Sequence, residues 1–198
     1  SEGIYAVGGG SVTIRSLGEI TTSGQGAEAI YANSTSYLGT GLVTLRTDGV
    51  LTTKGDEASA MAAFGDDVVI ISNSRITTTG DNSDGIHVEA VDDATVTSAG
   101  KIDAKGVLGD GIDIIAGGDA VVTTSGKISS ESGYGAIRVD AGGTATLTLA
   151  GKINADGDMF GGGAVLVEAD GDILVNSKAD LTAEASGGIL AVSNSGDV

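Results

Sequence analysis

The chain has 198 residues, with 34 Gly, no Pro, no Cys and no Trp, and a formal net charge of −17. A hydrophobic content of 40% with a mean hydropathy of +0.20 excludes a disordered chain. Twenty-seven acidic residues against ten basic ones argue against nucleic acid and anionic membrane surfaces as partners. Apolar runs such as Val68–Ile71 are far too short to insert into a bilayer.

One phrase recurs about every 26 residues, and a fixed period of this length predicts a solenoid whose repeats contact only their neighbours. Each copy opens with a small residue and then two apolar residues spaced by two, as in Gly85-Ile86-His87-Val88. The period of two indicates a short strand. The expected first strands are Ile4–Ala6, Ile30–Ala32, Met61–Ala63, Ile86–Val88, Ile112–Ile114, Ile137–Val139, Val165–Val167 and Ile189–Ala191.

Two more strands follow in each repeat. The second is anchored on an aliphatic residue such as Val68 or Ala94, and the third on an Ile or Leu such as Ile76 or Ile102, eight residues later in every copy. Inward positions are aliphatic or small and contain neither Phe nor Tyr. This composition favours a narrow core in which like side chains stack about 4.8 Å apart.

These patterns predict an all-β fold, a parallel β-helix with three strands per rung and about seven and a half rungs. The handedness preference of parallel crossovers makes the coil right-handed. Residues 1–198 form a single segment, and because the last copy stops partway, we expect it to be excised from a longer protein.

The phrases Gly3-Ile4-Tyr5-Ala6, Gly18-Glu19-Ile20-Thr21-Thr22-Ser23-Gly24 and Gly100-Lys101-Ile102-Asp103-Ala104-Lys105-Gly106 resemble the repeats of bacterial autotransporter passenger domains. The resemblance covers essentially the whole chain. It implies export to the bacterial cell surface or secretion, and a passenger role such as adhesion. It is not specific for activity, because such stalks carry adhesins, toxins, proteases and spacers.

Catalytic chemistry has little support in the sequence. The one histidine, His87, is expected outward on its strand, with Glu89, Asp92 and Asp93 as the nearby carboxylates. A solvated histidine is the favoured interpretation over a metal or general-base role. Asp113 and Arg138 share its outward column and are expected to form a surface ion pair. We therefore expect neither an enzyme nor a cofactor.

An acidic ladder precedes the second strands, and it consists of Asp67, Asp93 and Asp119 in successive rungs, with Asp172 two rungs further on. The favoured interpretation is that each carboxylate accepts the N–H of its own turn, as in an Asx-turn. The alternative is weak Ca²⁺ binding between rungs.

Two corners are candidates for partner binding. Residues after the third strands are expected to stack into an exposed apolar stripe, which either binds a partner or closes the corner. Its members are Val107, Leu108, Tyr134, Met159 and Phe160. The second candidate is an insertion in the second rung that carries Tyr37 and Leu38, which is either a recognition loop or neutral drift.

The leading functional hypothesis is a rigid adhesin or self-association stalk that binds a host-cell or bacterial surface protein or glycan. The alternatives are an extracellular polysaccharide lyase or hydrolase and an inert spacer. Ice binding is disfavoured, because the outward threonines Thr21, Thr52 and Thr77 give way to Asp103 and Ser129 in the next rungs.

Overall fold

The structure is a computed structural model that describes residues 2–34, 40–131, 135–156, 163–183 and 187–198. Within these ranges every regular element is a β-strand. The described residues accordingly include no helix long and apolar enough to cross a membrane.

The strands form three parallel sheets. The first sheet contains β1 (Ile4–Gly8), β4 (Ile30–Ser34), β7 (Met61–Gly65), β10 (Ile86–Ala90), β13 (Ile112–Ala116), β16 (Ile137–Ala141), β19 (Val165–Ala169) and β22 (Ile189–Ser193). The second contains β2 (Val12–Ser16), β5 (Leu42–Thr47), β8 (Asp67–Ser72), β11 (Ala94–Ser98), β14 (Ala120–Thr124), β17 (Ala145–Leu149) and β20 (Ile173–Ser177). The third contains β3 (Glu19–Thr22), β6 (Val50–Thr53), β9 (Arg75–Thr78), β12 (Lys101–Ala104), β15 (Lys127–Ser130), β18 (Lys152–Ala155) and β21 (Asp180–Ala183).

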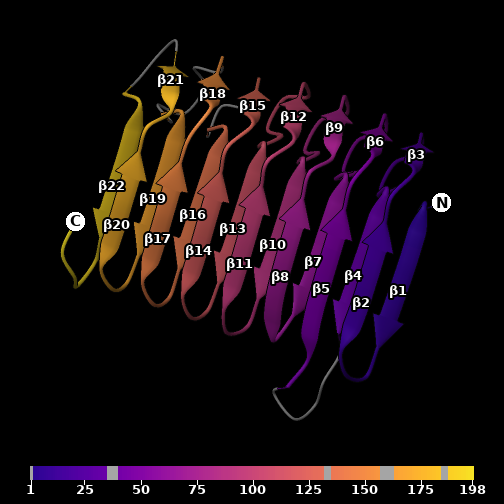
Figure 1. Cartoon of the computed structure of the whole chain (residues 1–198), viewed down its shortest axis with the longest axis horizontal. Helices are drawn as coiled ribbons and strands as arrows, with labels where there is room; N and C mark the ends of the chain where they lie inside the picture. The colour runs from indigo at the N-terminus through magenta and orange to yellow at the C-terminus, as the bar shows by residue number, and fades with distance from the viewer. Residues whose placement is uncertain (1, 35–39, 132–134, 157–162, 184–186) are drawn as a thin grey trace.

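Each strand pairs with the strand three places further along the chain, as β1 does with β4. The described strands therefore make seven turns, and β22 is the first strand of an eighth. The turns follow one another from the indigo N-terminal end to the yellow C-terminal end (Figure 1). The register is unbroken, since equivalent residues of successive copies face each other, as Ile86, Ile112 and Ile137 do. The predicted β-solenoid with three strands per rung is confirmed.

The core is a stack of aliphatic residues. Inward positions alternate with outward ones along the strands, and Ile76, Ile102 and Ile128 lie directly above one another with at most 1% exposure. Burying one such side chain contributes roughly 1.5–3 kcal/mol. The aromatic residues Tyr5, Tyr31 and Phe64 all lie outside this core, as the sequence predicts.

The corners between the third and first sheets are tight. A Cβ on Gly85 would lie 2.3 Å from Ile102 Cγ2 and 2.6 Å from the Gly111 carbonyl oxygen, so the small residue before β10 is a steric requirement. A small residue, Thr, Ser or Ala, ends each third-sheet strand, and its hydroxyl closes the corner after β9 and after β15. Thr78 Oγ1 donates a hydrogen bond to the Ser83 carbonyl at 2.9 Å, and Ser130 Oγ donates one to the Gly109 carbonyl at 2.8 Å.

Candidate functional site

The outer face of the first sheet carries a column of side chains that changes from aromatic to charged along the rod. Tyr5 and Tyr31 stack with ring centroids 4.9 Å apart, and Tyr31 contacts Phe64 of the adjacent outward column at 5.4 Å. Phe64 in turn lies 5.8 Å from the ring of His87. Because the two tyrosine rings are nearly parallel, each covers a face of the other.

His87 on β10 is the centre of a charged cluster. Its Nδ1 lies 3.1 Å from Asp113 Oδ2 and 3.4 Å from Asp84 Oδ2, while its Nε2 lies 3.3 Å from Glu89 Oε1. Asp84 belongs to the turn before β10, and Asp113 is the register partner of His87 on β13. Arg138 on β16 follows in the same column and reaches Asp113 Oδ1 at 3.4 Å.

The cluster is largely screened from solvent. The side chain of His87 is 19% exposed, that of Asp84 15% and that of Asp113 9%. Burial by itself would lower the pKa of His87, but hydrogen bonds to Asp113 and Asp84 and the charges of both carboxylates raise this pKa to about 10. The imidazole is therefore a cation at neutral pH unless another cation takes the place of its proton.

The sequence-based view of His87 is wrong in two respects. The side chain is largely screened from solvent, because Phe64 covers it from the preceding rung and Asp113 lies beside it in the next. Of the three carboxylates that the sequence places near His87, only Glu89 contacts the ring. The other two carboxylates in contact with it are those of Asp84 and Asp113. The expected ion pair between Asp113 and Arg138 is confirmed, although Asp113 is buried.

A second charged feature lies at the start of the third-sheet strands. One residue before the inward Ile of each strand, four successive rungs carry a basic side chain. We call Arg75, Lys101, Lys127 and Lys152 the basic ladder. These are four of the ten basic residues in the chain.

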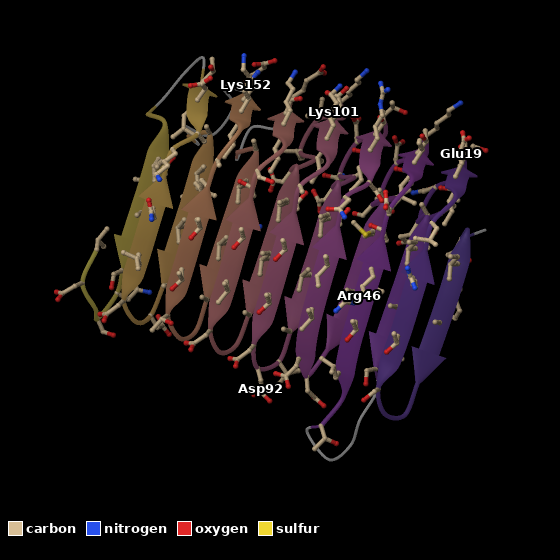
Figure 2. The ribbon with its side chains drawn as sticks, in the orientation of Figure 1. Glu19, Arg46, Asp92, Lys101 and Lys152 are labelled. Atoms are coloured by element: carbon tan, nitrogen blue, oxygen red, sulfur yellow. The ribbon has the colours of Figure 1, made fainter. Side chains whose placement is uncertain are left out.

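Most of the basic ladder is uncompensated. Lys101 pairs with Asp103 at 3.1 Å, but within the described ranges no ion pair joins Arg75, Lys127 or Lys152 to a carboxylate. Like charges stacked on adjacent strands repel each other. Figure 2 shows Lys101 and Lys152 along one edge of the rod, with Glu19 further along the same edge.

Two further basic residues stack on the second sheet. Arg15 of β2 and Arg46 of β5 are register partners and line a surface hollow together with Leu17 and Asp48. Arg46 lies away from the edge that carries the basic ladder (Figure 2). The arginine pair therefore provides an independent comparison for the effect of basic charge.

The acidic ladder differs from the sequence-based interpretation. Asp93 Oδ1 accepts the backbone N–H of Asp119 in the next rung at 2.8 Å, and Asp119 Oδ1 accepts that of Thr144 at 2.7 Å. Asp67 and Asp172 make the same kind of bond, to the N–H groups of Asp93 and Asp197. The carboxylates thus join neighbouring rungs and do not cap their own turns. The bond from Thr144 lowers the pKa of Asp119.

The predicted apolar stripe is only partly within the described residues. Val107 is 47% exposed, and Leu108 is half-buried with a positive φ of 61°, a backbone conformation that is costly for leucine. Tyr134, Met159 and Phe160 lie outside the described ranges, as do Tyr37 and Leu38 of the insertion. Partner binding by these residues stays a prediction.

Sequence reasoning missed the basic ladder and the contacts of Asp84 and Asp113 with His87, although the repeat contained the signal for the ladder. The residue before each third-strand anchor is basic in four successive copies, so aligning the copies on Ile76, Ile102 and Ile128 would have found the basic ladder. The convergence of Asp84 on His87 depends on the turn geometry, which the repeat pattern does not specify.

Comparisons of the chain with family models, curated proteins and solved structures find no match. The structure alone therefore supports the β-solenoid architecture, and membership of the autotransporter family is a proposal.

Proposed function

We propose that this chain is a segment of a surface-exposed or secreted passenger-type protein, and that it acts as a rigid adhesin stalk. The observation that supports this function best is the basic ladder on a rod of net charge −17. An unbroken register places the four cations in a straight row about 4.8 Å apart. Such a row attracts a linear polymer that carries repeated negative charges.

The partner that fits this row is an acidic glycan of a cell surface. Arg75, Lys127 and Lys152 are exposed, so their charged groups reach a ligand without rearrangement of the core. Residues Ala99, Gly100, Ser125 and Gly126, which precede Lys101 and Lys127, are small and uncharged, which leaves room beside the row. An anion along the ladder relieves the repulsion between its members.

The test is binding of the purified chain to a sulfated glycosaminoglycan and to a polyuronate, with uncharged dextran as the negative control. Beads coated with the chain are assayed in parallel for adhesion to cells that display sulfated glycans. We expect binding that weakens as salt is raised, because exposed ion pairs are screened. The double variant Lys127→Ser/Lys152→Ser should lose at least tenfold in affinity and most of the adhesion.

The matched control is Arg15→Ser/Arg46→Ser, which removes the same charge from the second sheet. It should bind like the unmodified chain. Equal losses of glycan affinity in the two variants would show that binding depends on net charge and not on the ladder. Unchanged affinity in the ladder variant would contradict the proposal. Circular dichroism of both variants checks that the fold is retained.

One observation favours a second candidate function, cleavage of an extracellular polysaccharide. The His87 cluster gathers three carboxylates, an imidazole and a guanidinium on one face, the kind of arrangement that acid–base catalysis uses. A reducing-end assay over a panel of polysaccharides tests it. Turnover that is lost in His87→Gln would establish the enzyme, and turnover that persists in this variant would exclude His87 as its catalytic residue.

A further inference from the structure

The His87 cluster has the geometry of a metal site. One ligand atom from each of Asp84, His87 and Asp113 lies within 4.8 Å of the other two, and His87 Nδ1 lies 3.4 Å from Asp84 Oδ2 and 3.1 Å from Asp113 Oδ2. They come from one turn and two adjacent strands of the rigid first sheet. Two carboxylate oxygens and one imidazole nitrogen thus face a common point.

Each carboxylate is oriented by its other oxygen. Asp84 Oδ1 accepts the backbone N–H of Asp110 at 2.7 Å, which leaves Oδ2 directed at His87. Asp113 Oδ1 accepts a hydrogen bond from Arg138 Nη1 at 3.4 Å, which leaves its Oδ2 toward the same nitrogen. Outer contacts of this kind orient the ligands in protein metal sites.

The imidazole is oriented in the same way. Glu89 Oε1 lies 3.3 Å from Nε2 and can accept a hydrogen bond from the Nε2–H group, so that in the neutral imidazole the lone pair of Nδ1 is the one that faces the two carboxylates. A lone pair opposite two negative oxygens requires a cation between them, which is either a proton or a metal ion. A carboxylate on the distal nitrogen is the common second partner of metal-bound histidines.

The distances distinguish among metals. Tetrahedral zinc with bonds of about 2.0–2.2 Å places its ligand atoms about 3.3–3.6 Å apart. The distances from Nδ1 to the two oxygens are 3.4 and 3.1 Å, so a zinc ion fits with shifts of a few tenths of an ångström. The nitrogen ligand disfavours Ca²⁺ and Mg²⁺, which prefer oxygen.

We propose that Asp84, His87 and Asp113 bind one zinc ion on the outer face of the first sheet, with a fourth position open to water or to a partner's donor group. Arg138 and Glu89 act as positioning residues through Asp113 and His87. The site uses none of the basic ladder, so it stands or fails independently of glycan binding.

The test is titration of the purified chain with Zn²⁺ and with Co²⁺, at about pH 8 because the metal must displace the proton on Nδ1. Calorimetry with Zn²⁺ should give one ion per chain, and Co²⁺ should give the strong visible absorption bands of a tetrahedral complex. His87→Gln should lose at least tenfold in affinity together with these bands. Glu89→Gln, which keeps an acceptor but removes the charge, should lose less.

Asp93→Asn is the matched control, because Asp93 belongs to the acidic ladder and not to the cluster. It should bind zinc as the unmodified chain does. Absence of the Co²⁺ bands in the unmodified chain, or equal zinc affinity in His87→Gln, would overturn the proposal and leave the proton as the cation of this cluster. Melting curves without metal check that each variant folds.

Discussion

At the scale of the residue, the stability of the rod depends on single aliphatic side chains that have an identical neighbour above and below. Ile102 is fully buried between Ile76 and Ile128. Replacing it with Ala removes packing on both sides and leaves a cavity that the stacked backbones cannot close.

We therefore expect Ile102→Ala to lower the free energy of unfolding by about 2–5 kcal/mol, measured by chemical denaturation with circular dichroism. Val121→Ala is the control, because Val121 points outward from β14 and is 38% exposed. Its effect should stay within about 0.5 kcal/mol. Similar losses in the two variants would contradict the inward assignment of the third-strand anchors.

A second residue-scale prediction concerns Asp103, which accepts hydrogen bonds from Lys101 and Ser129. Burial acts to raise the pKa of Asp103, but these bonds and the charges of Lys101 and Lys105 outweigh it and lower the pKa. A carboxylate with a lowered folded-state pKa stabilises the fold above its unfolded pKa, and this contribution disappears as the pH falls through the folded value.

Asp103→Asn should accordingly destabilise the chain at pH 7, by less than about 1 kcal/mol since the pair is partly solvated. The difference from the unmodified chain should shrink as the pH is lowered below 3.8, the ordinary value for this side chain. Asp140→Asn, at an exposed site, is the control. A pH-independent difference for Asp103→Asn would refute the ionic origin of the effect.

At the scale of the element, the corners between sheets are fixed by close approach of backbones. A Cβ on Gly106 would lie 1.7 Å from the carbonyl oxygen of Gly80, and one on Gly80 would lie 1.9 Å from that of Gly55. These distances leave no space for a methyl group unless neighbouring rungs separate.

Gly106→Ala should thus cost about 1–3 kcal/mol or more, because overpacking forces the backbone to shift. Gly10→Ala is the matched control, since a Cβ at Gly10 meets nothing within 4 Å. Thermal melting of the two variants measures the difference. A Gly106 variant as stable as the Gly10 variant would show that the corners are looser than the structure describes.

The acidic ladder joins elements of neighbouring rungs through side-chain acceptors. Asp93→Ala removes the acceptor for the Asp119 N–H and should cost about 0.5–1.5 kcal/mol, whereas Asp93→Asn keeps an acceptor oxygen and should cost much less. The unmodified chain, Asp93→Asn and Asp93→Ala should show the same order of melting temperatures in millimolar calcium as in EDTA. A melting temperature that rises with calcium only when Asp93 is present would restore the calcium interpretation.

The elements themselves were predictable because their signal is local. Apolar residues at period two, repeated in every copy, identify the strands, and the constant spacing from Val68 to Ile76 and from Ala94 to Ile102 fixes the register of two sheets. The hydrogen bonds of the acidic ladder between rungs were not predictable. An aspartate in a turn can accept a backbone N–H of its own turn or one of the next rung. Turn geometry decides between these options, as it does for Asp84 and His87.

At the scale of the whole molecule, one property supports every surface feature, namely the unbroken stacking of the rungs. The basic ladder, the His87 cluster and the acidic ladder each combine residues about 26 positions apart. A slip of one residue in any rung would turn its outward side chains inward.

The measurement that tests this stacking most directly is a distance between two spin labels in one outward column. Thr44 of β5 and Thr146 of β17 are connected through Val69, Thr95 and Val121, four rung spacings in all. The chain has no native Cys, so the labels can be attached to Thr44→Cys and Thr146→Cys without background. With about 4.8 Å per rung, the backbone positions should lie ~19 Å apart and give one narrow distance distribution. A broad distribution, or a distance that requires more or fewer than four rungs, would contradict the stacked rod.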